Sequence, residues 1–297
     1  MNNIYDSIII GAGISGMTAA IYLKRYNLNV LIIEKEIPGG QISKASLIEN
    51  YPGIKKTDGI TFSTNLLNQI EELGLKINYE EVIEIKEENE IKIVKTNNNE
   101  YKTKIIIIAT GRKPKSLNIG EEKYIGKGLS YCATCDGMFY KDKEVIIVGG
   151  GNSALEESLY LSDICEKVTI LNRSSELKAD KILIEKVQKR NNIEILYNEE
   201  IKEIKEENDK IKGIITKNNK EIKCEGIFIY IGLIPNTEIF KNIKQENDYI
   251  LVNNNQETNK KGIYAVGDVT KKSLYQLVTA ASDGALAANH IKNNIEE

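Results

Sequence analysis

Two stretches of the sequence decide the fold. Residues 7–35 read SIIIGAGISGMTAAIYLKRYNLNVLIIEK, and residues 145–173 read VIIVGGGNSALEESLYLSDICEKVTILNR. Each has a short β-branched run, a glycine loop, a helical segment and a second β-branched run, which is typical of a buried parallel sheet. The sequence therefore predicts two copies of one nucleotide-binding unit. The copies align without a gap, and the residues of the first copy that are identical in the second are Ile8, Ile9, Gly11, Gly13, Ser15, Tyr22, Leu23, Val30 and Ile32.

The glycine loops have the pattern expected beside a bound pyrophosphate. The first glycine permits a tight turn, the second lets the backbone approach the phosphates, and the third lets the helix pack closely on the strand. Gly11, Gly13 and Gly16 fill these positions in the first copy, and Ala154 replaces the third glycine in the second. The free N–H groups and the dipole of the following helix favour the phosphates. Because the pattern occurs twice in register, we interpret both loops as dinucleotide sites.

The last residue of the second strand differs between the copies. It is Glu34 in the first copy, where a carboxylate can accept a hydrogen bond from a ribose 2′-hydroxyl. The aligned residue in the second copy is Asn172, followed by Arg173. This pair lacks a carboxylate that would repel a 2′-phosphate, and it adds a guanidinium. The first copy thus fits a dinucleotide with a free ribose, and the second tolerates a phosphorylated one.

A further repeat extends the duplication to complete domains. Residues 105–114, IIIIATGRKP, and residues 227–235, IFIYIGLIP, are both apolar runs that end in Gly-x-x-Pro. The segment GIYAVGDV at 262–269 and the helical pattern after it have no duplicate partner. We therefore predict an α/β fold with two Rossmann-like dinucleotide-binding domains, the second inserted into the first. The first domain comprises residues 1–113 and 246–297, and the second comprises residues 114–245.

The composition narrows the functional classes. The chain has 297 residues, of which 41% are hydrophobic and 28% charged, and its formal net charge of −3 indicates no basic face for nucleic acid. Residues 7–23 carry no charge, but their glycines fit a strand–loop–helix unit better than a membrane span. Four cysteines and the lack of a signal-peptide pattern favour a reducing cytoplasm. With His290 as the single histidine, we predict no metal centre and no His-based triad.

The sequence YCATCDG at 131–137 places two thiols, Cys132 and Cys135, between the two glycine loops. The Cys-x-x-Cys spacing often lowers the pKa of one thiol and suits disulfide exchange. Half a zinc site is the alternative, but Cys165 and Cys224 do not form a second Cys-x-x-Cys, and we interpret both as packing residues. Asp136 is either the proton carrier of the dithiol or the cap of a helix.

With these parts assembled, the sequence resembles the low-molecular-weight, prokaryote-type thioredoxin reductases over essentially its whole length. The resemblance implies a thioredoxin-disulfide reductase of the FAD-dependent pyridine nucleotide-disulfide oxidoreductases. It further implies FAD in the first domain, NADPH or NADH in the second, thioredoxin as the protein substrate, and a homodimer. The motifs that carry it are GAGISGMTAA at 11–20, GGQI at 39–42, IENYPG at 48–53, ATG at 109–111, CATCDG at 132–137, GGGNSALEESLYL at 149–161, IGLIPNT at 231–237 and GIYAVGDV at 262–269.

Individual residues receive roles in the same way. We expect Cys132, at the exposed start of its motif, to attack the substrate disulfide, Cys135 to face the flavin, and Asp136 to carry the proton. The FAD-binding residues implied are Gly11, Gly13, Ser15, Gly16, Glu34, Lys35, Gly40, Gln41, Asn50, Val82, Ala109, Gly111, Gly267, Asp268 and Gln276. Those implied for the nicotinamide dinucleotide are Gly151, Asn152, Ser153, Ala154, Arg173 and Lys178.

Two departures from the family pattern leave the electron donor open. The family usually has His-Arg-Arg-x-x-x-Arg for the 2′-phosphate, whereas residues 172–178 read NRSSELK and keep Arg173, with Lys178 as a partial substitute. Tyr275 stands where the family commonly has an arginine before Gln276. One alternative is therefore a flavoprotein that takes electrons from reduced ferredoxin and has a degenerate nicotinamide site. The other is a non-catalytic, flavin-binding redox sensor.

Overall fold

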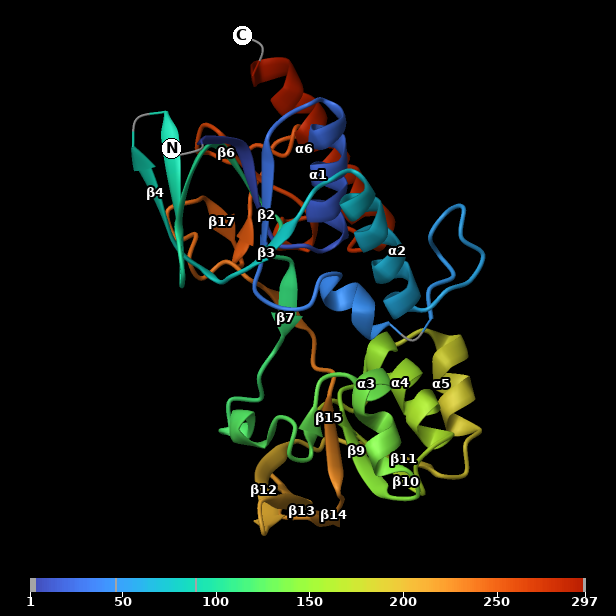
Figure 1. Ribbon diagram of the computed structural model, residues 1–297. Helices are drawn as coiled ribbons and strands as arrows, with labels where there is room; N and C mark the ends of the chain where they lie inside the picture. Colours follow the sequence, from blue (N-terminus) through green and yellow to red (C-terminus); the bar gives the residue numbers. More distant parts are fainter. Residues whose placement is uncertain (1–3, 46, 89, 296–297) are drawn as a thin grey trace. The chain divides into compact units, whose positions relative to one another are not determined.

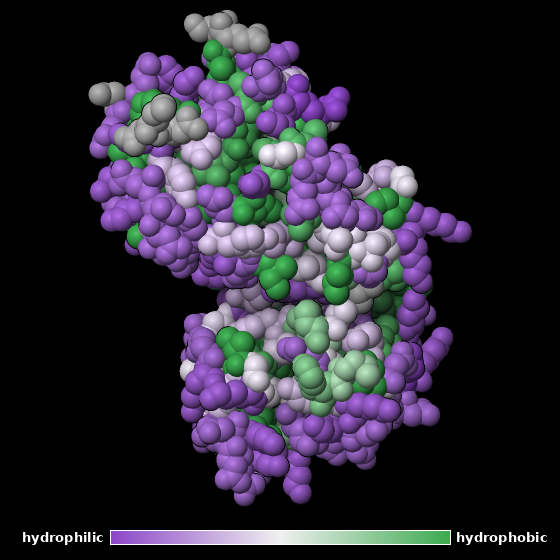
Figure 2. Space-filling model, in the orientation of Figure 1, coloured by the Kyte–Doolittle hydropathy of each residue, from purple (hydrophilic) through white to green (hydrophobic). Residues whose placement is uncertain are grey.

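The computed structural model describes residues 4–45, 47–88 and 90–295. The chain forms two compact units, one of Met1–Lys113 with Ile234–Glu297 and the other of Pro114–Leu233. Each unit is built on its own β-sheet with helices against it (Figure 1). The visible face of each unit is mostly hydrophilic, and its apolar side chains appear in small separate groups (Figure 2). No helix in these described ranges has the length and apolar character needed to cross a membrane.

The first unit has a seven-stranded sheet in the order β3-β2-β1-β6-β5-β4, with β19 also paired to β6. Strands β3, β2, β1, β6 and β19 are parallel, and β6, β5 and β4 form an antiparallel meander. The strands are β1 (Ile4–Ile10), β2 (Val30–Glu34), β3 (Ile77–Tyr79), β4 (Val82–Glu88), β5 (Ile91–Thr96), β6 (Glu100–Ile108) and β19 (Ile263–Ala265).

Side chains alternate between the two faces of this sheet. Ile9 and Ile107 pack with the helices α1, α2 and α6, whereas Ile8 and Ile106 pack on the opposite face with the meander and with Phe240. This period of two is what a strand buried on both sides produces. The helical elements of the unit are α1 (Ile14–Arg25), η1 (Gly40–Lys44), α2 (Gly59–Glu72), η4 (Gly267–Val269) and α6 (Leu277–Ile295), and the short hairpin β17 (Gln245–Glu246) and β18 (Tyr249–Ile250) completes it.

The second unit repeats this plan with a five-stranded parallel sheet in the order β11-β10-β9-β15-β8. Helices α3, α4 and α5 cover one face, and the antiparallel sheet β12-β13-β14 covers the other. The helical elements are η2 (Glu121–Tyr124), α3 (Ala133–Asp136), η3 (Gly137–Tyr140), α4 (Asn152–Ser162) and α5 (Lys181–Gln188). The strands are β8 (Leu129–Ser130), β9 (Glu144–Val148), β10 (Lys167–Asn172), β11 (Ile193–Tyr197), β12 (Ile201–Glu207), β13 (Lys210–Thr216), β14 (Glu221–Lys223) and β15 (Gly226–Ile229).

Strand registers confirm the internal duplication. Ser7 pairs with Val30 in the first unit, and the residues aligned with them, Val145 and Val168, pair in the second. The closing strands agree as well, because Ser7 also pairs with Ile105 and Val145 also pairs with Gly226. The predicted α/β fold with two Rossmann-like units, the second inserted into the first, is therefore confirmed.

The return of the chain to the first unit differs from the prediction. The structure places it between Leu233 and Ile234, whereas the sequence predicts it at 245/246. The physical reason is that Phe240 and Ile243 are buried in the core of the first unit. Both points at which the chain changes unit lie in a two-stranded sheet of β7 (Arg112–Pro114) and β16 (Leu233–Pro235).

A buried carboxylate closes the first loop of the second unit. Glu121 has an exposed fraction of 0% and accepts hydrogen bonds from the Leu117 and Ile119 N–H groups and from the Ser116 hydroxyl. Burial raises the pKa of this carboxyl group, but these hydrogen bonds and one from its own N–H outweigh burial and hold the pKa below 4.5. Glu121 therefore acts as an ionised anchor for the loop.

Candidate functional site

The glycine loop of the first unit leaves room for a ligand at one position only. Gly11 has φ +108°, and a Cβ there would lie 2.3 Å from the Ala109 carbonyl oxygen. A Cβ on Gly16 would lie 2.1 Å from the Gly11 carbonyl oxygen, so the fold itself requires both glycines. Gly13, the N-cap of α1, has ordinary dihedrals of −78° and 179°, and a Cβ there would meet nothing within 4 Å. This open cradle fits the approach of a pyrophosphate to the backbone.

Glu34 lies at the end of β2, directly beside this loop. Its Oε2 accepts a hydrogen bond from the Ala12 N–H at 2.7 Å, and its Oε1 accepts one from the Glu36 N–H at 2.9 Å. These bonds fix the carboxylate, and each oxygen keeps a lone pair. The arrangement fits the predicted contact with a ribose hydroxyl, whereas Lys35, the next residue, is exposed.

The predicted flavin-side residues come together from distant segments of the first unit. The Asn50 Nδ2 donates to the Gln276 Oε1 at 3.0 Å, although the two residues are 226 positions apart. The Gln41 Nε2, from η1, donates to the Arg112 carbonyl oxygen at 3.2 Å. The structure places the remaining predicted residues of this unit as follows: Gly40 lies in η1, Ser15 is buried in α1, Val82 is buried at the start of β4, Ala109 and Gly111 follow β6, and Gly267 and Asp268 lie in η4.

Arg112 is a functional candidate that the sequence reasoning missed. Its Nε and Nη2 both donate to the Asp268 Oδ2, at 3.1 and 2.6 Å, and its guanidinium lies 4.2 Å from the centre of the Tyr275 ring. An arginine is therefore present beside Tyr275, but it comes from another segment of the chain. Its position directly after Gly111 in the ATGRKP motif was the available signal.

The Gly267–Asp268 turn has its own support. The Gly267 N–H donates to the Asp283 Oδ2 of α6 at 2.9 Å, and the Lys272 ammonium forms a largely buried ion pair with the same carboxylate. Gly267 has φ +76°, so its backbone lies in the left-handed region that favours glycine. Asp283 thus holds in place the residue that precedes Asp268.

The second unit has the same loop geometry. A Cβ on Gly149, which has φ +140°, would lie 2.2 Å from the Tyr230 carbonyl oxygen. Gly151 is the N-cap of α4, and the nearest atom to a Cβ there is 3.8 Å away. Ala154 is buried at the position of Gly16, and Asn152 and Ser153 are exposed at the start of the helix. This loop also fits a dinucleotide.

Asn172 occupies the position aligned with Glu34, but its side chain binds the backbone of the chain instead of pointing free toward a ribose. It is buried, and its Nδ2 donates to the Ser174 carbonyl oxygen at 2.8 Å and to the Glu176 carbonyl oxygen at 2.9 Å. The Lys178 N–H donates to the Gly150 carbonyl oxygen at 2.7 Å. Asn172 therefore folds residues 173–178 toward the glycine loop and has no free N–H for a ribose. The Arg173 and Lys178 side chains are exposed.

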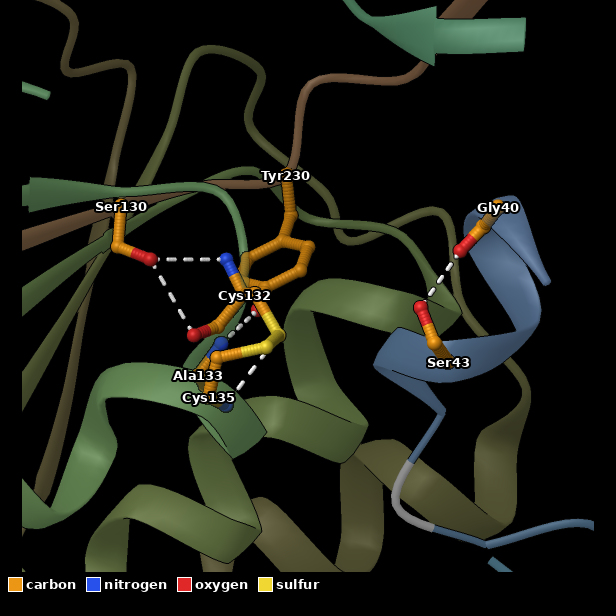
Figure 3. The surroundings of a disulfide bond; sticks show 7 residues. All are labelled: Gly40, Ser43, Ser130, Cys132, Ala133, Cys135 and Tyr230. Atoms are coloured by element: carbon orange, nitrogen blue, oxygen red, sulfur yellow. Dashed lines mark hydrogen bonds between the residues drawn. A yellow bond between two sulfur atoms is a disulfide. The ribbon is translucent and has the colours of Figure 1, made fainter. Parts of the chain in front are cut away.

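Cys132 and Cys135 form a disulfide at the start of α3, with their Cα atoms 5.3 Å apart (Figure 3). The Ser130 hydroxyl accepts from the Cys132 N–H at 2.9 Å, and the Cys135 N–H donates to the Cys132 Sγ at 3.2 Å. The Ala133 N–H donates to the Tyr230 hydroxyl oxygen at 2.7 Å. The predicted packing residues Cys165 and Cys224 are buried and free.

In the CATCDG motif, the structure differs from the expectation for Cys132 and from the capping alternative for Asp136. Cys132 was expected to be exposed, and that is wrong: the residue has an exposed fraction of 8%, whereas Cys135 is exposed. The reason is that Cys132 lies two residues after the buried strand β8 and beside Tyr230. Asp136 precedes η3 but makes no capping hydrogen bond with its side chain, so it does not act as a helix cap.

Comparisons with known proteins identify the family. Residues 5–285 match the family described as pyridine nucleotide-disulphide oxidoreductase. The chain is 42% identical to a thioredoxin reductase of Bacillus subtilis over 302 aligned residues, which cover 99% of this chain and 96% of that one. This chain belongs to the thioredoxin reductases. Its structure matches that of Lactococcus lactis thioredoxin reductase with a TM-score of 0.90 and 39% identity, covering 97% of this chain and 98% of that one. It matches T. acidophilum thioredoxin reductase with a TM-score of 0.89 and 35% identity, covering 99% of each chain.

Membership of the thioredoxin reductases settles the general chemistry. The protein is a flavoprotein disulfide reductase and a thioredoxin-disulfide reductase, and the cofactors of its family are FAD and NADPH. The glycine cradles, the carboxylate of Glu34 and the oxidised Cys132–Cys135 pair agree with this chemistry. A non-catalytic redox sensor is therefore the less supported interpretation.

Proposed function

We propose that this protein reduces oxidised thioredoxin with electrons from NADPH, through FAD held by the first unit and the Cys132–Cys135 disulfide of the second. The observation that carries the proposal is that disulfide, which lies in the unit that also holds the second glycine loop. FAD and NADPH supply hydride transfer and the electron pair that opens the disulfide. The residues of the chain bind and orient them and handle the thiols and protons.

In the first unit, we assign FAD binding to the open cradle at Gly13 and to the carboxylate of Glu34. The Asn50–Gln276 hydrogen bond and the Arg112–Asp268 ion pair support this assignment, because both arrange polar groups in the unit that contains the cradle. The other predicted residues keep their assignments as proposals. In the second unit, the cradle at Gly151 and the exposed cations Arg173 and Lys178 support binding of NADPH.

The dithiol step needs a nucleophile and a proton carrier. The Cys135 N–H that donates to the Cys132 Sγ favours a thiolate on Cys132 once the disulfide is reduced, because a hydrogen bond to the charged form lowers the pKa of a thiol. We therefore assign the attack on thioredoxin to Cys132 and the resolving step to Cys135. Burial of Cys132 in this structure means that the attack requires its sulfur to become accessible. Asp136 is free of capping bonds and is our candidate proton carrier.

Single-turnover reduction of the flavin and steady-state reduction of thioredoxin test these roles together. We expect Cys132→Ser and Cys135→Ser to abolish thioredoxin reduction while NADPH still bleaches the flavin, because the thiols act after the flavin. Cys165→Ala is the matched control, since that cysteine is buried and free, and it should retain turnover. Near wild-type thioredoxin reduction by either serine variant contradicts the proposal.

The donor is tested separately, because one observation favours a second candidate. The Asn172 side-chain N–H groups donate to backbone carbonyl oxygens and are not free for a 2′-phosphate. That contact then falls to the exposed cations Arg173 and Lys178. Anaerobic bleaching by NADPH, NADH and reduced ferredoxin in parallel decides the matter. If both nicotinamides fail at about millimolar concentration, far above the usual KM range, while ferredoxin bleaches the flavin, a ferredoxin-dependent reductase replaces NADPH dependence.

We further propose that the enzyme works as a homodimer in the cytoplasm. Support for the location comes from the few cysteines, of which two form the redox pair and two are buried and free. Light scattering on the FAD-loaded protein tests the assembly, and a monomer across the working concentration range contradicts it.

A further inference from the structure

Residues 173–178 of the second unit pack directly on its glycine loop. The Lys178 N–H donates to the Gly150 carbonyl oxygen at 2.7 Å, and Lys178 forms a parallel β-bridge with Gly151. A Cβ on Gly150 would lie 2.2 Å from the Asn172 Oδ1, so only a glycine lets the loop and this segment approach so closely. The segment that carries the proposed 2′-phosphate contacts is therefore bound to the loop proposed for the pyrophosphate.

Asp180 and Asn152 join the end of this segment to the start of α4. The Asn152 Nδ2 donates to the Asp180 Oδ2 at 3.0 Å, and the Asp180 N–H donates to the Asn152 Oδ1 at 2.8 Å. Asn152 is the first residue of α4 and directly follows Gly151, the glycine of the open cradle. Two reciprocal hydrogen bonds fix both the distance and the orientation of the two residues. The Asn152–Asp180 pair thus sets where the segment ends relative to the cradle.

The Asp180 side chain does not make the bond that is usual for its position. Asp180 is the N-cap residue of α5, where an aspartate ordinarily accepts a hydrogen bond from its own helix, but it makes no such capping bond. Asp58, the N-cap residue of α2, does accept from the Thr61 N–H, at 2.8 Å. Asp180 therefore stabilises the contact between two helices in place of the start of its own helix.

We propose that Asp180 is a positioning residue for the 2′-phosphate of NADPH. Through its bonds with Asn152, it fixes the segment that carries Arg173 and Lys178 relative to the pyrophosphate cradle. The proposal rests on the proposed NADPH site and deepens it. A nucleotide with both phosphate groups engages the cradle and the cations together, so their relative placement determines its affinity. A nucleotide without the 2′-phosphate needs only the cradle, so the pair contributes to selection of NADPH over NADH.

The sign of the effect separates this role from simple electrostatics. Asp180 is exposed and places a negative charge beside a site proposed for phosphates. By charge alone, its removal strengthens the binding of NADP+, whereas loss of a positioning contact weakens it. Asp180→Ala removes the charge and the acceptor, and Asp180→Asn removes the charge but keeps an oxygen that can accept from the Asn152 Nδ2. Glu185→Ala is the matched control, because it removes the same charge from an exposed position farther along α5.

Calorimetric titration of the FAD-loaded enzyme with NADP+, and with NAD+, which lacks the 2′-phosphate, measures the effect. In Asp180→Ala the NADP+ dissociation constant should rise roughly 2- to 10-fold, the range of one net hydrogen bond, while that of NAD+ stays near the wild-type value. Asp180→Asn and Glu185→Ala should bind NADP+ at least as tightly as the wild type. In an Asn152→Ala background, Asp180→Ala should cause no further weakening, because Asp180 acts through Asn152.

Hydrogen exchange in the nucleotide-free enzyme gives a readout that does not depend on the donor. The Lys178 N–H is bonded to the Gly150 carbonyl oxygen, so its exchange reports whether the segment stays on the glycine loop. It should be faster in Asp180→Ala than in the wild type, and Asp180→Asn should restore the wild-type rate.

Unchanged or tighter NADP+ binding in Asp180→Ala, an equal loss for NADP+ and NAD+, or unchanged exchange at Lys178 overturns the proposal. In each of these cases the wild type still binds NADP+, so the proposed function stands. A wild-type enzyme that binds neither nucleotide overturns the NADPH donor, and the role of Asp180 in recognition fails with it.

Discussion

Replacement of the open glycine at the N-cap of α1 separates what the fold needs from what the cofactor needs. In Gly13→Ala, the new methyl group meets nothing within 4 Å and the dihedrals remain ordinary. The gain from restricting the unfolded chain, about 0.4–1 kcal/mol, and the loss of a favourable N-cap residue, about 0.5–1 kcal/mol, nearly cancel. We therefore expect the stability of the FAD-free protein to change by less than about 1 kcal/mol.

FAD binding should respond much more strongly. The methyl group occupies the space through which the pyrophosphate approaches the backbone, and inserting a methyl group into a filled site typically costs about 1–3 kcal/mol. This corresponds to an FAD dissociation constant raised roughly 5- to 150-fold. The measurement is titration of the FAD-free protein by quenching of flavin fluorescence, alongside its thermal unfolding.

Two other glycines serve as controls for this experiment. Gly151→Ala makes the same change in the second unit, so FAD affinity should stay at the wild-type value while NADPH binding weakens. Gly11→Ala should destabilise the FAD-free protein itself, because its φ of +108° and the nearby Ala109 carbonyl oxygen exclude a Cβ. Unchanged FAD affinity in Gly13→Ala, or a loss of several kcal/mol in its FAD-free stability, refutes the reasoning.

Three further changes test the electrostatic arrangement. Glu121→Gln should lower the free energy of unfolding at pH 7 by about 1–3 kcal/mol. Because the pKa of Glu121 in the folded protein is below 4.5, the difference between variant and wild type should shrink as the pH falls below 4.5. A difference that stays constant with pH in chemical denaturation contradicts this role of Glu121. Arg173→Ala should raise the KM for NADPH roughly 10-fold and leave that for NADH nearly unchanged, so equal effects on both in steady-state assays would remove Arg173 from the phosphate site. Asp283→Asn weakens the ion pair with Lys272 that backs the Gly267 turn, so equilibrium dialysis should show weaker FAD binding, and wild-type affinity would contradict this role.

Local patterns were sufficient for the parts of the fold that repeat. The gapless match of the two glycine-loop segments anticipated strand registers that agree residue by residue, because the same strand–loop–helix unit buries the same positions twice. The return of the chain at Ile234 was not anticipated. Its cause is the packing of Phe240 and Ile243 against the first sheet, which is a contact between distant segments and leaves no local signature.

In the candidate site, too, local motifs were sufficient for some residues and not for others. The motifs predicted the glycine loops, Glu34 and the Cys-x-x-Cys pair, because their chemistry depends on residues close together in sequence. Burial of Cys132 and the ion pair of Arg112 with Asp268 depend on where distant segments meet. Neither could be read from spacing, although the motif that contains Arg112 was visible.

The bonds made by Asn172 restrict how the coenzyme preference of this chain can evolve. A single substitution that installs a carboxylate at the end of the second strand is the shortest mutational route to a preference for NADH. At this position, Asp in place of Asn would direct oxygen lone pairs at the carbonyl oxygens of Ser174 and Glu176 that now receive the Asn172 N–H groups. The Asn172→Asp change therefore disrupts the 173–178 turn before it improves recognition of the NADH ribose. A lineage that changes its electron donor from NADPH to NADH has to rebuild this turn first.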